Sequence, residues 1–112
     1  MAIIVEKSSF KKIWVAGNRE GVRSLLEQIA GRLANQDGTK VHRNEDGCLT
    51  ISTSEFSFDV DVDGDYSGFW IHPPDQLLDE DAPRWNRFLE DFHESVIVPV
   101  KDKTGGVATG IG

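Results

Sequence analysis

Apolar side chains recur at helical spacing between residues 22 and 33 and mark the clearest element of the chain. They fall at i, i+3, i+4, i+7, i+8 and i+11, so they form one stripe along a helix with a period of 3.6 residues. The stripe consists of Val22, Leu25, Leu26, Ile29, Ala30 and Leu33. Asn18 can accept hydrogen bonds from the free amides of the first turn. We therefore predict a helix that begins after Asn18, ends within residues 35–38 and packs on a sheet.

A second pattern, with a period of two, runs through residues 55–63. It predicts a strand whose apolar side chains share one face. These side chains are Phe56, Phe58, Val60 and Val62. Gly64 and Asp65 then suit a two-residue hairpin turn of the primed type, so we predict that a second strand returns antiparallel to the first.

This turn also predicts which residues lie opposite each other across the hairpin. On the apolar face, Val60 would lie opposite Phe69, and Phe58 opposite Ile71. The other face would hold three carboxylates, two aromatic side chains and a histidine. Its pairs would be Asp59 with Trp70, Asp61 with Gly68, Ser57 with His72 and, next to the turn, Asp63 with Tyr66.

The rest of the chain predicts short strands and one more helix. Strands are expected at residues 3–6, 11–16, 39–43, 48–53 and 96–100, the last at a sheet edge because it contains Pro99. A second helix is expected after Asp81 as its cap, with Pro83 in the first turn. Its buried stripe would be Trp85, Phe88, Leu89 and Phe92.

These elements predict an α+β fold, a mostly antiparallel sheet of about five to seven strands with two helices packed on one face. At 112 residues the chain fits one domain, which we place at residues 1–100. Residues 101–112 contain four glycines and no apolar pattern, so we predict a flexible Gly-rich tail.

The net charge of −7 is unevenly distributed along the chain. Residues 1–43 carry 8 Lys or Arg against 4 Asp or Glu, whereas residues 44–100 carry 2 against 14. The acidic second half would repel nucleic acid, so we expect no nucleic-acid partner. It would suit a basic protein partner, or it would simply keep the domain soluble.

Cysteine usage and hydropathy bear on the compartment. Cys48 has no second cysteine to pair with, and a reducing compartment is compatible with this. The apolar run at the N-terminus is too short for a signal peptide, and no stretch approaches the ~20 apolar residues of a membrane span. We expect a cytoplasmic protein without a membrane partner.

The motifs for metal, phosphate and nucleophilic chemistry are incomplete. Residues 59–64 match the first half of a calcium-binding EF-hand loop, but Trp70 stands where the closing glutamate belongs. His42, His72, His93 and Cys48 lack the tight spacing of zinc ligands, although a fold can assemble such a site. Residues 17–21 lack the lysine and the spacing of a phosphate-binding loop. We therefore expect no cofactor, no resident metal and no catalytic residue.

The polar face of the hairpin is the candidate site. Aromatic and charged side chains mixed on one face are typical of protein interfaces, where aromatics anchor and charges orient. The alternative is that the second helix or the N-terminal strands cover this face, which would place Trp70 in the core. The predicted partner-binding residues are Asp59, Asp61, Asp63, Asp65, Tyr66, Trp70 and His72.

The run Gly17, Asn18, Arg19, Glu20 and Gly21, which leads from a strand into a helix, resembles a family of small bacterial immunity proteins encoded beside polymorphic toxins. The resemblance covers roughly residues 10–60. It implies a non-enzymatic inhibitor that binds one cognate toxin and blocks its active site. Many such toxins are basic nucleases, which would suit the acidic half of this chain.

Two other classes of function stay open at this point. One is a small enzyme or metal-binding domain that uses His42, His72 or Cys48. The other is a structural or regulatory domain that self-associates through an edge strand. For the oligomeric state we expect a monomer or a weak homo-oligomer.

Overall fold

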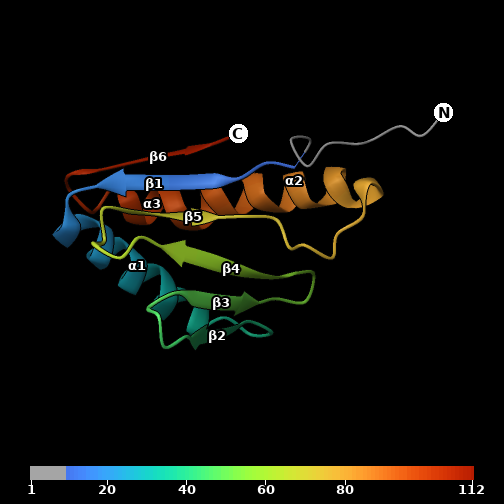
Figure 1. Cartoon of the computed structure of the whole chain (residues 1–112), viewed down its shortest axis with the longest axis horizontal. Coiled ribbons are helices and arrows are strands. Elements are labelled where there is room, and N and C mark those ends of the chain that lie inside the picture. The colour runs from blue at the N-terminus through green and yellow to red at the C-terminus, as the bar shows by residue number, and fades with distance from the viewer. Residues whose placement is uncertain (1–9) are drawn as a thin grey trace.

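The computed structural model describes residues 10–112, which form a six-stranded antiparallel sheet. The strand order is β2-β3-β4-β5-β1-β6, so β2 and β6 are the edges (Figure 1). The strands are β1 (Ile13–Gly17), β2 (Lys40–Arg43), β3 (Leu49–Ser52), β4 (Ser57–Val62), β5 (Gly68–Ile71) and β6 (Val107–Ile111).

The helices of residues 10–112 lie on one face of this sheet, in agreement with the predicted α+β fold (Figure 1). The first helix, α1 (Arg19–Ala34), buries the predicted stripe and is capped by Asn18, whose Oδ1 accepts from the Gly21 amide at 2.7 Å. The second helical segment is continuous: a 3-10 turn η2 (Asp79–Asp81), α2 (Ala82–Phe92), a π-helical turn η3 (His93–Ile97) and α3 (Val98–Lys101). The prediction of a mostly antiparallel sheet with helices on one side is therefore confirmed.

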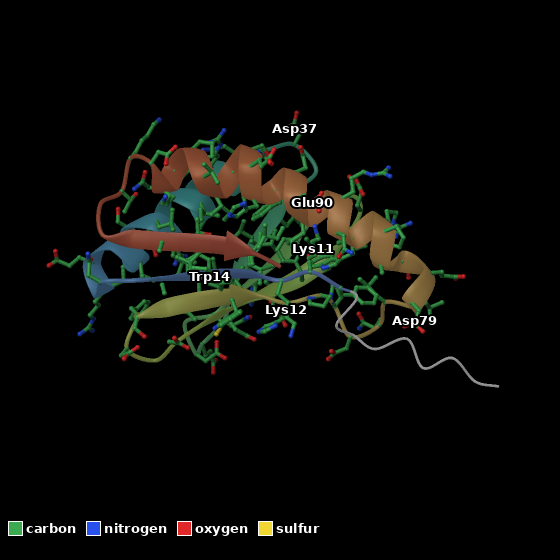
Figure 2. The ribbon with its side chains drawn as sticks, turned by 90° about the horizontal axis from the view of Figure 1, so that it is seen from above. Lys11, Lys12, Trp14, Asp37, Asp79 and Glu90 are labelled. Carbon is green, nitrogen blue, oxygen red and sulfur yellow. The ribbon has the colours of Figure 1, made fainter. Side chains whose placement is uncertain are left out.

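The core between sheet and helices is centred on Trp85 of α2, whose side chain is 0% exposed. Phe56 and Phe58 meet its indole edge-on, with ring centroids 5.3 and 5.8 Å away. The indole Nε1 donates to the carbonyl oxygen of Lys11 at 2.9 Å, so its polar atom is paired inside the core. Lys11 also pairs with Glu90 of α2, which joins the start of β1 to this helix (Figure 2).

The hairpin between β4 and β5 differs in register from the prediction. Asp61, not Asp59, lies opposite Trp70, and Val60 lies opposite Ile71. The loop holds residues 64–67 and closes on a hydrogen bond from the Asp63 amide to the Gly68 carbonyl. The Asp65 carboxylate accepts from the Ser67 amide, and Tyr66 adopts a φ of +58°, so local side-chain bonding extends the turn by two residues. Because this shift is even, the paired side chains of β4 and β5 keep their predicted faces.

Two predictions for the C-terminal third are wrong. Residues 96–100 are helical and include Val96, Ile97 and Val100 as core residues, because the stripe of α2 continues into them. The predicted tail at 101–112 is not without structure either, since residues 107–111 form β6 and pair with β1 along its whole length.

The start of the second helix also differs in detail. Asp81 does not cap the free amides of α2; its carboxylate accepts from the Leu78 amide at 3.0 Å instead. The turn η2 runs directly into α2, so the helical backbone continues through Asp81. The strand predicted at residues 3–6 lies outside the described residues. No helix within residues 10–112 has the length and apolar character needed to cross a membrane.

We predict that Trp85→Ala lowers the free energy of unfolding by about 3–5 kcal/mol, because it leaves a large cavity and removes the bond to Lys11. Urea denaturation followed by circular dichroism measures this change. Arg87→Ala, an exposed position on the same helix, is the matched control and should change stability by about 0.5 kcal/mol or less. Equal losses in the two variants would contradict the central role of Trp85.

Candidate functional site

The face of the sheet opposite the helices is polar and aromatic, and no described element packs on it (Figure 1). Strand alternation puts the core residues Ile13, Val15, Phe69 and Ile71 on the helix side, so their neighbours point outward. The outward side chains include Trp14 on β1, Trp70 on β5, and Asp59 and Asp61 on β4. We call this surface the open face.

Two tryptophans form the apolar part of the open face. Trp14 and Trp70 lie directly opposite each other on β1 and β5, and they are 38% and 42% exposed. The indole of Trp14 lies flat over Gly110 of β6, since a Cβ added there would come within 2.7 Å of three indole atoms. Trp70 stacks on His72, with centroids 6.0 Å apart and 12° between the ring planes. An aromatic strip therefore crosses three strands.

Carboxylates line the strip on the β4 side. Asp61 lies opposite Trp70, and its Oδ2 is 3.6 Å from His72 Nε2. Asp59 accepts from the Thr50 hydroxyl at 2.8 Å and is exposed. Beside them a groove of about 490 Å³ opens along the segment that follows β5. It is lined by Ser57, Phe58, Asp59, Asp61, His72, Pro73, Pro74, Asp75 and Gln76.

The open face also carries positive charge at its two ends. Lys12 precedes β1 and lies opposite Gly112, and Lys40 lies on β2, both exposed. In Figure 2, Lys12 and Trp14 lie on the side of β1 away from α2, and Lys11 lies toward Glu90. The carboxylates of β4 are thus at the middle of the face, between the tryptophans and β3. This arrangement places negative charge at the middle of the open face and positive charge toward its two ends.

The turn residues of the predicted site are not all on this face. Tyr66 points toward α1, where the Arg23 guanidinium lies 5.1 Å from its ring centroid. The prediction that Tyr66 joins Trp70 is therefore wrong, and the left-handed backbone at Tyr66 is the cause. Asp65 lies in the exposed loop, and Asp63 directly precedes the loop and accepts from the Ser67 hydroxyl at 3.4 Å. Hydrogen bonds from Ser67 lower the pKa of Asp65, so it is ionised.

The motif at residues 17–21 lies away from the open face and packs against the turn that precedes β6. Gly17 and Gly21 leave room for that turn: a Cβ on Gly17 would clash with the Gly106 carbonyl oxygen, and one on Gly21 would lie 2.7 Å from that of Gly105. The backbone N–H of Asn18 donates to the Gly106 carbonyl oxygen at 3.1 Å. Gly106 itself has a φ of +76°, which favours glycine. Arg19 and Glu20 are exposed in the first turn of α1.

The residues that an enzyme or a metal-binding domain would use, His42, His72 and Cys48, are dispersed over the sheet. His42 on β2 and His72 after β5 are separated by β3 and β4, which is about 14 Å of sheet. Burial raises the pKa of the Cys48 thiol, and burial lowers that of His93, whose Nε2 lies 3.2 Å from Thr109 Oγ1. Within residues 10–112, no three His, Cys, Asp or Glu side chains are grouped so that they could hold a metal ion.

Two features of the open face were not predicted. The sequence predicts a strand at Trp14, but the predicted site does not include this residue, although its place between Ile13 and Val15 indicates that it faces outward. The groove beside His72 depends on how residues 73–76 leave the sheet, and no periodicity describes that path. Comparisons with protein-family models, curated proteins and solved structures found no match to this chain.

We predict that iodoacetamide alkylates Cys48 slowly in the folded protein, because the raised pKa leaves little thiolate at neutral pH. The rate should rise about tenfold per pH unit without levelling off below pH 9.0, the ordinary value for the thiol. Mass spectrometry of the modified protein measures it, and urea-unfolded protein is the control. A plateau near pH 7 would reveal an activated thiol and favour the enzyme reading.

Proposed function

We propose that this protein is a non-enzymatic inhibitor that binds a basic protein partner through the open face, in the manner of a bacterial immunity protein. The partner would be a cognate toxin, of the nuclease type, met in the cytoplasm. The observation that carries the proposal is the pair of exposed tryptophans beside the carboxylates of β4. Residues 17–21 support it only as a resemblance, because their contacts are internal.

The tryptophans have the properties of interface anchors. A buried indole contributes large contact area at low cost in side-chain entropy, and such residues dominate binding energy at many interfaces. Trp14 and Trp70 already have their orientations restricted, by Gly110 and by His72 respectively. A partner that covers them would therefore gain the burial without ordering two mobile side chains.

The carboxylates give the face its preference for a cationic partner. Asp59 and Asp61 are exposed and directed outward, and Asp63 and Asp65 extend the negative charge beyond the end of β4. Such a row raises the association rate of a positive surface, most strongly at low salt. A guanidinium or ammonium group of the partner would fit between Asp61 and the face of Trp70.

A hydrolytic use of the same groove is less consistent with its contacts. Ser57, His72 and Asp61 line it together, but the Ser57 hydroxyl pairs with that of Ser52 at 3.0 Å. A nucleophilic serine instead shares its hydrogen with the histidine that acts as its base. A contact surface, unlike a hydrolytic site, is consistent with the present orientations of Ser57, His72 and Asp61.

The first experiment identifies the partner. If a large toxin gene lies beside the gene for this protein, the toxin's C-terminal domain should be retained on the immobilised protein and lose its toxic activity. Binding is measured by calorimetry with both purified proteins. A neighbouring toxin that neither binds nor loses activity would remove the proposal.

With that partner, we predict that reversing Asp59, Asp61 and Asp63 to lysine lowers the association rate about 10-fold or more and weakens its dependence on salt. Stopped-flow fluorescence measures the rate at several salt concentrations. The matched control reverses Asp37, Asp91 and Glu94, which are exposed on the helix side and change the net charge equally. If both variants slow equally, net charge and not the open face attracts the partner.

We also predict that Trp70→Ser and Trp14→Ser each weaken binding by about 2 kcal/mol or more, chiefly through faster dissociation. Ser57→Ala, on the same face, should leave the dissociation constant within about threefold. Calorimetry measures all three, and thermal unfolding verifies that each variant is folded. Unchanged affinity in both tryptophan variants would exclude the open face as the contact.

A further inference from the structure

The two edges of the sheet differ in how they are protected. The edge strand β2 carries Lys40, His42 and Arg43, and charged side chains discourage another strand from pairing. The other edge, β6, belongs to a segment without any charged side chain from residue 104 to residue 112. It contains no proline and, among the described residues, no strand pairs with its outer side (Figure 1).

The hydrogen-bond pattern determines which groups of β6 point outward. Gly112 exchanges two backbone bonds with Lys12, at 3.0 and 3.1 Å, and Asn18 donates to Gly106. In an antiparallel ladder every second residue bonds to the same neighbour, so Ala108 and Gly110 also face β1. The N–H and C=O groups of Val107, Thr109 and Ile111 therefore point away from the sheet. Their side chains lie on the helix side, as the core contacts of Val107 and Ile111 indicate.

We propose that β6 pairs with β6 of a second copy of this chain, antiparallel and about a twofold axis at Thr109. Thr109 would face Thr109 of the second copy, and Val107 would face Ile111. Each of these pairs would exchange two backbone hydrogen bonds, which uses all the outward groups of the strand. The two sheets would then join into one continuous sheet with the helices of both copies on the same face.

The side chains of β6 match this register on both faces. On the helix side, Val107 opposite Ile111 would extend the apolar core across the junction, since both already pack against it. On the open face, Ala108 would lie opposite Gly110, so neither residue of the pair carries a bulky side chain, and the Trp14 indole that covers Gly110 would lie beside the Ala108 methyl group of the second copy. Figure 1 shows α2 and α3 behind β1 and β5, so no helix or strand of residues 10–112 lies along the outer side of β6.

Charge favours a second copy over a cationic strand at this edge. The chain has a net charge of −7, and identical acidic molecules approach each other most easily where they carry no charge. Residues 104–112 are such a stretch. A cationic partner would instead be attracted to β4, three strands away in the sheet. The proposed pairing leaves Trp14 and Trp70 uncovered, so the dimer would present two open faces side by side.

The test combines sedimentation with hydrogen exchange on the intact protein. We expect a monomer at about 5 µM and a rising dimer fraction toward about 500 µM, as a small interface requires. Over the same range, the amides of Val107, Thr109 and Ile111 should become protected, whereas those of β2 should exchange equally at both concentrations. A monomer with unprotected amides at the higher concentration would overturn the proposal. Protection independent of concentration would also overturn it, because it would mean that the edge is covered within one chain.

Thr109→Pro removes the outward N–H at the twofold axis and retains the β1 ladder, whose bonds come from the neighbouring residues. We expect it to abolish the dimer. The control is Thr109→Val, which loses the same hydroxyl bonds to His93 and Trp14 but keeps the N–H, and it should dimerise as before. A folded Thr109→Pro variant that still dimerises would assign the dimer to another surface and refute the pairing.

Discussion

The packing of both helical segments on one face of the sheet is the constraint on which the rest of the molecule depends. A sheet covered on one side must put its apolar side chains there, and β4, β5 and β1 do so by strict alternation. The other side chains of these strands are then held outward at fixed spacing. The helix α2 is linked to the sheet by Trp85, which contacts Phe56 and Phe58 and donates a hydrogen bond to the backbone before β1. The open face is thus a consequence of how the core is built.

Local patterns were enough to predict much of this architecture. The stripe of α1, its cap at Asn18 and the two-residue period of β4 each depend on neighbours in sequence, so they could be recognised there. The hairpin register was wrong by two residues because Asp65 and Ser67 form a local bond that competes with the tighter turn. The predicted face of each paired residue of β4 and β5 is still correct, because a register shift of two residues does not move a side chain to the other face of the sheet.

The errors near the C-terminus have a different origin. Strand β6 has weak intrinsic preference for a strand, with two glycines among residues 106–110, and it is held by contacts across almost the whole chain. Those contacts need Gly17 and Gly21 on one side and the left-handed Gly106 on the other. Residues 96–100 have the composition of a strand but complete the core beneath the sheet as a helix. In both cases tertiary contacts override local preference.

The inward side chains of the central strands pack in the core, whereas the outward side chains of the same strands are exposed, so the two sets are under different packing constraints. The inward side chains Ile13, Val15, Phe69 and Ile71 must fill a fixed volume, whereas the outward side chains Trp14, Trp70, Asp59 and Asp61 are exposed. Substitutions at the outward positions therefore leave the interior packing intact. A lineage that carries this fold can therefore exchange one set of outward side chains for another without first acquiring compensating changes in its core.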